Sequence, residues 1–396
     1  MDRRKFLKQS SLASSLFFVP SFVKAFEEVA TGSLGYKRLV IIQLSGGNDG
    51  LNTVIPFRND LYYKERPSLS IPKNQIFKLT DDVGLHKSLF PLKRLYDNGN
   101  LSIINNVGYP NPVRSHFRSM DIWQTATDSD KYLQSGWLGR YLDNYGAHPY
   151  NAIEIDESLS LAMKGDTMNA IATQDARILH NLSKDPYFKN VNKYQNDAHL
   201  SEHNLGYLYK SMIAAESSAK YIYETSKTAT SNKEYPNNAF GKQLKTMAQF
   251  INSGLKTKVF YGSLGGFDTH VNQLNKQKKL LEVYANGIEA FVQDLKENDM
   301  FKDTLILTFS EFGRRVKQNA NIGTDHGTAN NVFIIGDKLK KQGLYNDMAS
   351  LSDLDDNGDL KFEIDFRTIY ATVLNKWLEV NDEKVLNKTF NKLNFI

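Results

Sequence analysis

The chain of 396 residues contains no cysteine. This absence excludes disulfide bonds, thiolate nucleophiles, iron–sulfur clusters and zinc sites with cysteine ligands. Any bound metal must therefore be held by histidine and carboxylate groups. Any covalent nucleophile must be a serine, threonine, tyrosine, lysine or aspartate.

The chain also has no concentrated basic region. Its formal net charge is +5, from 49 lysines and arginines against 44 aspartates and glutamates. Five of these basic residues lie within residues 1–25 against a single acidic residue, so the rest of the chain is close to neutral. Nucleic-acid-binding proteins normally carry a basic footprint. We therefore expect no nucleic-acid partner.

The N-terminal 25 residues have the order of an export signal. Arg3 and Arg4 precede a mildly apolar stretch at 12–19, and small residues follow. This order resembles a twin-arginine signal, which predicts the twin-arginine translocon as a partner and a location in the periplasm, in the cell envelope or outside the cell. A cytosolic basic N-terminus is the alternative. The apolar stretch is short and interrupted by Pro20, so we do not expect it to anchor the chain in a membrane.

Short β-branched runs alternate with stretches whose apolar residues recur every three or four positions. The runs predict strands at 38–44, 101–108, 258–261, 304–309 and 332–336. The other stretches predict helices at 86–98, 115–126, 136–145, 204–226, 237–254, 272–299 and 367–378. Together they predict an α/β fold of three layers, in which a mostly parallel sheet has helices on both faces.

The predicted domain organisation is simple. Residues 1–25 form the signal peptide and residues 26–36 a linker. Residues 37–396 form a single α/β domain, with a polar helical insertion at about 175–235.

Acidic and histidine residues follow the predicted strands. These candidate metal ligands are Asp49, Asp268, His270, Glu311, Asp325 and His326. In an open α/β sheet the ligand crevice lies beyond the carboxyl ends of the strands, so we expect these side chains to meet there. Their chemistry suits one or two divalent ions: zinc, manganese, calcium or magnesium. Taken singly, each aspartate in a glycine-rich turn has a purely structural interpretation as a turn former.

Ser115 is the candidate nucleophile. It follows a turn at Pro112 and is expected at the N-cap or in the first turn of a helix, where backbone N–H groups and the positive helix end favour an anion. His116 and Arg118 add a proton carrier and a positive charge nearby. The alternative is that Ser115 only caps the helix and that the nearby arginines are solvated.

Five segments together resemble an exported bacterial family, number 1501 among the domains of unknown function. They are Leu44–Asn52, Arg114–Asp121, Gly266–His270, Phe309–Arg314 and Gly323–Thr328. That family is similar to the alkaline phosphatase and sulfatase superfamily. The resemblance implies an alkaline-phosphatase-like fold and a two-metal site, with Ser115 as nucleophile and Asp49 as the metal ligand after the first strand.

The resemblance also implies roles for the later residues. Asp268 and His270 match ligands of the first metal, Glu311 stands where ligands of the second metal leave a strand, and His326 matches the late histidine. The chain departs from the superfamily in two places: Asp268 and His270 are unusually close, and Glu311-Phe312 replaces an Asp-His pair that Asp325-His326 is the alternative candidate to supply.

These patterns lead to two functional hypotheses. The first is an exported metal-dependent hydrolase of phosphate or sulfate esters, acting on a small-molecule or polymer substrate. Ser115 would attack, and His116 or Arg118 would steady the anion. The second is a non-catalytic binding or partner protein of the cell envelope built on the same scaffold, because a fold does not by itself guarantee chemistry.

Overall fold

The computed structural model describes residues 36–184 and 203–396. The predicted signal peptide and residues 26–35 of the predicted linker lie outside these residues, as does part of the predicted insertion. Residues 37–396 form one compact unit. Among the described helices, none combines the length and the apolar character needed to cross a membrane.

A nine-stranded sheet forms the centre of this unit, in the order β11-β5-β10-β9-β1-β8-β6-β7, with β12 also paired to β5. The strands are Arg38–Leu44 (β1), Leu101–Gly108 (β5), Ala152–Glu154 (β6), Ile171–Ala172 (β7), Val259–Leu264 (β8), Thr304–Phe309 (β9), Asn330–Ile335 (β10), Gly343–Leu344 (β11) and Ile364–Asp365 (β12). All pairs are parallel except those of β10, which runs antiparallel to β5 and β9. The predicted, mostly parallel sheet is confirmed.

The strand β10 was predicted, but its antiparallel direction was not. It follows β9 through residues 310–329, which contain no helix. A parallel neighbour needs a crossover connection, normally a helix, whereas a strand that returns without one lies antiparallel. The loop before β10 therefore lies at the same edge of the sheet as the ends of β1, β8 and β9.

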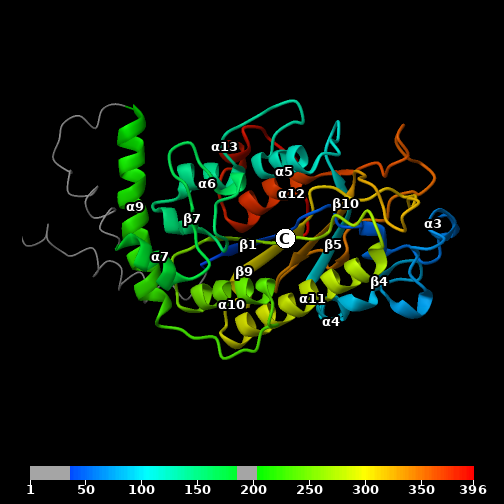
Figure 1. Cartoon of the computed structure of the whole chain (residues 1–396), viewed down its shortest axis with the longest axis horizontal. Coiled ribbons are helices and arrows are strands. Elements are labelled where there is room, and N and C mark those ends of the chain that lie inside the picture. Colours follow the sequence, from blue (N-terminus) through cyan, green and yellow to red (C-terminus); the bar gives the residue numbers. More distant parts are fainter. Residues whose placement is uncertain (1–35, 185–202) are drawn as a thin grey trace, which may run out of the picture. The chain divides into compact units, whose positions relative to one another are not determined.

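Helices cover both faces of the sheet (Figure 1). The helices are Asp60–Glu65 (α3), Phe90–Asp97 (α4), His116–Thr125 (α5), Trp137–Tyr145 (α6), Ala176–Ser183 (α7), His203–Ser226 (α9), Ala239–Asn252 (α10), Gln273–Glu297 (α11), Phe366–Thr372 (α12) and Asp382–Leu386 (α13). Helix α12 continues as a π-helical turn at Val373–Trp377. Helices α7 and α9 fall within the predicted insertion.

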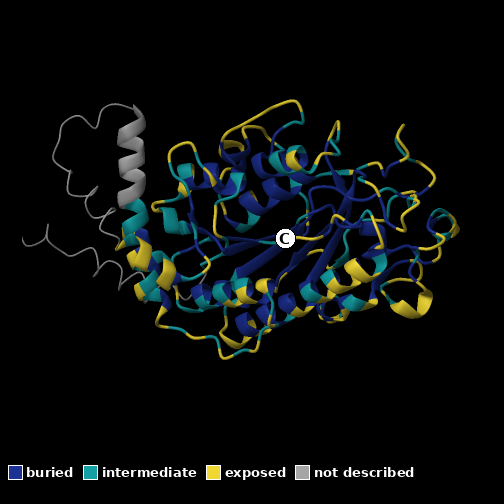
Figure 2. Cartoon of the chain, in the orientation of Figure 1, coloured by how far each residue is buried: buried dark blue, intermediate teal, exposed yellow. Residues whose placement is uncertain are grey.

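Alternation along β1 explains the three layers. Val40 and Ile42 pack into a core with residues of α4, α10 and α11. Leu39 and Ile41 point the other way, into a second core with residues of α5, α6, α12 and α13. Successive side chains of a strand face opposite sides, so a continuous apolar strand buries both faces. Figure 2 shows the resulting pattern, with buried strands between helices whose outer surfaces are exposed.

A smaller sheet of three strands, in the order β2-β4-β3, lies beside α3 in the sequence. Its strands are Val54–Ile55, Gly84–His86 and Ile76–Lys78, respectively. These strands have only two or three residues, too few for a period-two pattern to stand out from the surrounding loops.

Candidate metal centre

The candidate site lies at the carboxyl edge of the main sheet. Strands β1, β8 and β9 are parallel neighbours, so the loops that follow them adjoin. The loop before β10 reaches the same edge because β10 is antiparallel. The N-terminus of α5 completes the site, since its first residue, His116, contacts these loops.

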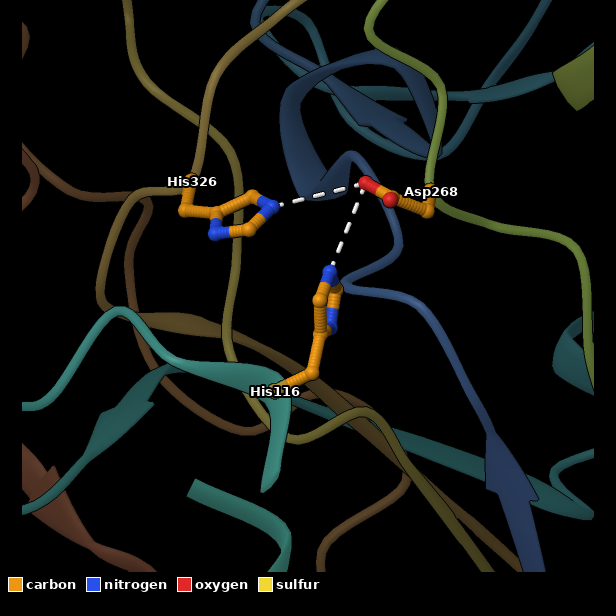
Figure 3. Close-up of side chains that lie close together, drawn as sticks. All are labelled: His116, Asp268 and His326. Carbon is orange, nitrogen blue, oxygen red and sulfur yellow. Dashed lines mark hydrogen bonds and ion pairs between the residues drawn. The ribbon is translucent and has the colours of Figure 1, made fainter. Parts of the chain in front are cut away.

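His116, Asp268 and His326 converge from three separate segments (Figure 3). One ligand atom from each lies within 4.8 Å of the others. Asp268 Oδ1 is 3.4 Å from the Nε2 atoms of both His116 and His326. His270 Nε2 joins them, at 3.0 Å from Asp268 Oδ1 and 2.9 Å from His326 Nε2. We call these four residues the histidine–aspartate cluster.

Each histidine of the cluster is held at Nδ1 by an oxygen. His116 Nδ1 is 2.8 Å from Glu311 Oε1, and His270 Nδ1 is 3.1 Å from Asp325 Oδ1. His326 Nδ1 is 2.6 Å from the carbonyl oxygen of Arg114. Carbonyl and carboxylate oxygens only accept, so each Nδ1 donates. When Nε2 carries no proton, its lone pair therefore points into the cluster.

This arrangement fits a metal ion. Oxygen acceptors behind ring nitrogens orient the imidazoles of metal-binding histidines. Two unprotonated Nε2 atoms facing each other at 2.9 Å would repel, so His270 and His326 need a proton or a metal ion between them. The buried Nε2 of His116 makes no hydrogen bond with any of the described residues. Histidine nitrogens with one carboxylate form the donor set that zinc prefers.

Glu311 supports His116 rather than joining the cluster. Its side chain is fully buried, and Oε1 also accepts a hydrogen bond of 2.8 Å from the backbone N–H of Gly46. The hydrogen bond that His116 donates to Glu311 raises the pKa of His116, against the opposing effect of burial, and the charges of Glu311 and Asp268 add to the rise. A more basic ring is also a stronger metal donor.

The pKa values of Asp268 and His326 are both lowered, with different consequences for charge. Partial burial raises the pKa of Asp268, but the hydrogen bond and charge of Arg314, together with the nearby histidines, outweigh it and lower the pKa to about 2. Burial lowers the pKa of His326, and the charge of Arg314 lowers it further. The cluster therefore combines a carboxylate that stays ionised with a histidine that favours its neutral, metal-binding form.

Arg314 fastens the loops around the cluster. It is buried, and its guanidinium donates to the carbonyls of Gly46, Gly47 and Thr324 and, at 2.7 Å, to Asp268 Oδ1. It thus joins the loops that follow β1 and β8 to the loop before β10. Sequence reasoning did not assign Arg314 a role, because its partners are distributed over three distant segments.

Asp49 lies outside the cluster. Its carboxylate is buried, and Oδ2 is 2.6 Å from Arg66 Nη1 and 2.5 Å from Gln273 Nε2. Arg66 is fully buried as well. A role for Asp49 as a metal ligand stays a prediction. What the structure shows is a buried ion pair that connects the loop after β1 to Arg66.

Ser115 occupies the N-cap position of α5, as predicted. It is exposed, and its side chain makes no capping hydrogen bond. Its two neighbours contact the cluster: the carbonyl of Arg114 accepts from His326, and His116 is a member. Arg118 is placed differently, because its guanidinium donates to the carbonyls of Ser129 and Lys131. Its role in steadying an anion stays a prediction.

The described residues thus define an α/β protein with a histidine–aspartate cluster at the carboxyl edge of its sheet. Residues 101–390 match a family described as "Protein of unknown function (DUF1501)", and the chain belongs to that family. No curated protein sequence matches the chain.

Three solved structures show how far the likeness extends. The zinc complex of the C-terminal periplasmic domain of EcEptC from Escherichia coli is 12% identical, with a TM-score of 0.37 over 76% of this chain and 73% of that one. The lipoteichoic acid synthase LtaP from Listeria monocytogenes is 10% identical, with a TM-score of 0.38 over 79% and 69%. The PsFucS1 sulfatase from Pseudoalteromonas sp. is 13% identical, with a TM-score of 0.38 over 93% and 74%. Likenesses this distant assign no activity to the chain.

Proposed function

We propose that this chain is an exported, metal-dependent hydrolase of phosphate or sulfate esters. The observation that carries the proposal is the cluster itself. Three histidines, each held at Nδ1 by an oxygen, direct Nε2 toward Asp268. Ser115 directly precedes His116 in the chain and is exposed at the start of a ten-residue helix.

His116, Asp268 and His326 would hold the ion and leave one coordination position for the ester, with His270 beside them. Zinc fits this donor set best, and manganese is the next candidate. A bound ion would polarise the ester and stabilise the negative charge that develops on its oxygens.

The proposal gives the chain's own groups distinct tasks. Ser115 supplies the attacking hydroxyl and, with the first backbone N–H groups of α5, receives the anionic ester at the positive end of the helix. Glu311 and Asp325 keep His116 and His270 oriented. Arg314 fixes the position of Asp268.

The contacts favour one ion over two. Asp49 is paired with Arg66, and Glu311 is engaged by His116 and Gly46, so each carboxylate already has protein partners. Three of the remaining donors, which are one aspartate and three histidines, suffice for a single ion that keeps a position open for the ester.

A non-catalytic role as a binding or partner protein of the cell envelope is the second candidate. The observation that favours it is the hydrogen bond from Arg314 to Asp268, because it places a permanent cation on the only carboxylate of the cluster. Turnover separates the two candidates, since a binding protein would show none with any ester.

Export is part of the proposal and rests on Arg3 and Arg4, which lie outside the described residues. Replacing both arginines with lysine keeps the charge but removes the twin-arginine pair. We expect the variant to accumulate in the cytoplasm while the unchanged chain appears in the periplasmic or secreted fraction. Equal export of both would contradict this part of the proposal.

The catalytic test uses the protein purified after export, loaded with zinc or manganese, and a panel of phosphate and sulfate esters. Ser115→Ala should lower turnover on the order of a thousandfold or more, because a missing nucleophile disables the whole catalytic unit. Ser217→Ala, at an exposed serine of α9, serves as the matched control and should retain activity. Turnover retained by Ser115→Ala would remove Ser115 from the mechanism.

A further inference from the structure

A cavity of about 290 Å³ lies directly beside the histidine–aspartate cluster. Phe312 forms the wall between the two: it lines the cavity, and its ring centroid is 4.7 Å from that of His116 and 4.8 Å from that of His326. Val113 and Thr328 also line it, two residues from Ser115 and His326 respectively. The cavity and the cluster therefore adjoin across the ring of Phe312, close to the segment that carries Ser115.

The cavity presents mainly apolar surfaces. Pro112, Val113, Phe312, Leu360 and Phe362 contribute to its walls. Such a lining favours the burial of an apolar group.

The polar groups in the lining are already paired within the protein. Tyr109 Oη is 3.0 Å from Ser119 Oγ, and Thr328 Oγ1 donates to the carbonyl of Leu360. Asp355 Oδ1 accepts from two backbone N–H groups of its own turn, at 2.9 and 2.8 Å. A ligand would thus gain little from hydrogen bonds here and more from apolar contact.

One wall of the cavity is fixed by a buried ionic contact. Asp359 is fully buried and pairs with both Arg114 and Arg315. It belongs to a hairpin turn closed by the bridge between Leu354 and Leu360. These contacts attach the turn to the segment that carries Ser115, so the cavity exists before any ligand binds.

A second hollow, of about 380 Å³, lies on another side of the cluster and differs in character. It includes Asp325 and is lined by the charged residues Glu65, Arg315 and Lys317 as well as by apolar residues. The cavity behind Phe312 has the larger apolar share of the two and suits an apolar group better.

From this contrast, we infer that the cavity behind Phe312 binds the apolar part of the ester substrate. The substrate class is then a phosphate or sulfate ester of an apolar alcohol or phenol. The inference rests on the proposed function, because it assumes that the cluster receives the ester group.

Esters of ethanol, butanol and hexanol test this inference. Their leaving groups have similar acidity, so chain length is the main variable. In the metal-loaded wild type, kcat/KM for the phosphates or the sulfates should rise by about fourfold per methylene group that enters the cavity. A series in which kcat/KM does not change with chain length would overturn the inference.

Val113→Trp should fill the cavity and reduce the ratio of hexyl to ethyl ester turnover toward one. Val380→Trp is the matched control. Val380 is also half-buried, but it follows Glu379, which pairs with Lys37 at the opposite end of β1, so the control should keep the wild-type ratio. Should Val113→Trp fail to fold, Phe362→Ala removes cavity wall instead and should lower the ratio severalfold. An unchanged ratio in the folded variant would overturn the inference.

Calorimetric binding of hexyl and ethyl phosphate separates this inference from the proposed function. Tighter binding of the hexyl ester that is lost in Val113→Trp, without hydrolysis of any ester, would support the cavity and contradict the hydrolase. Hydrolysis of all chain lengths at one rate, with equal binding, would contradict the cavity and support the hydrolase.

Discussion

Two aspartates follow neighbouring strands of the same sheet and have different surroundings. Asp49, after β1, is 1% exposed and is paired with the buried Arg66. The side chain of Asp268, after β8, is 48% exposed and faces three histidines as well as Arg314. A buried carboxylate depends on its own cation, whereas an exposed carboxylate among imidazoles is available to a ligand. Both residues lie at the edge of the sheet because each follows a strand. They differ in burial, and this difference decides which of them a ligand can reach.

Removing Arg66 should have the largest effect on the free energy of unfolding. Arg66→Met leaves the carboxylate of Asp49 buried without its cation, which should lower the free energy of unfolding by about 3–5 kcal/mol. Urea denaturation measures the loss. The double variant Asp49→Asn/Arg66→Met also removes the buried charge and should recover part of it. A loss below about 1 kcal/mol in the single variant would show that the pair does little for stability.

Glu154 sharpens the comparison, because it is a buried carboxylate at the same edge that forms no ion pair with any described residue. Burial raises its pKa to about 7, although hydrogen bonds from Ser160 act in the opposite direction. The unfolded chain releases this proton near pH 4.5 and the folded chain near pH 7. The stability that protonated Glu154 contributes is therefore fully present below the unfolded pKa and is lost as the pH rises through 7.

For the wild type, this shift predicts that the free energy of unfolding falls on the order of 2–3 kcal/mol between pH 4 and pH 8 on account of Glu154. Glu154→Gln cannot titrate and should remove that part of the pH dependence. Denaturation curves of both proteins across this range provide the measurement. Parallel pH profiles would contradict the shifted pKa.

Glu311→Gln should lower the affinity of the cluster for a metal ion without removing a cluster residue. The change takes away the negative charge behind His116, and losing such an outer contact typically costs a metal site 10–100-fold in affinity. Competition with a chelator measures the affinity for zinc. Asp325→Asn makes the matching change behind His270. Equal zinc affinity in the wild type and both variants would contradict the supporting role of these carboxylates.

Ser115→Ala should change stability least. Ser115 makes no capping hydrogen bond, so we expect the free energy of unfolding to change by less than about 0.5 kcal/mol. Asn238 is the comparison, since its side chain accepts from the N–H of Gly241 at the start of α10. Asn238→Ala should cost about 1 kcal/mol. A larger loss for Ser115→Ala would indicate that its main task is to cap α5.

The sequence contained enough information for most of the fold. The five predicted strands correspond to β1, β5, β8, β9 and β10, because buried strands are continuous apolar runs. The long helices followed from their three- and four-residue spacing. The strand order and the reversed direction of β10 depend on contacts between distant segments, which periodicity does not report.

For the site, the rule that ligands gather beyond strand ends brought Asp268, His270 and His326 together correctly in space. The same rule could not tell that Asp49 is paired with Arg66, 17 residues away, because no local pattern connects them. The cavity behind Phe312 could not be predicted from the sequence either. Its walls come from separate parts of the chain, residues 108–113, 312, 328–329 and 355–362.

Metal content tests the central claim most directly. Elemental analysis of the protein purified after export should find about one divalent ion per chain in the wild type and none in Asp268→Ala/His270→Ala. The control Asp156→Ala/His148→Ala removes the same two residue types outside the cluster and should keep the ion. A folded wild type that contains no metal and takes up none on reconstitution would contradict the metal centre. An Asp268→Ala/His270→Ala variant that keeps its ion would contradict it as well.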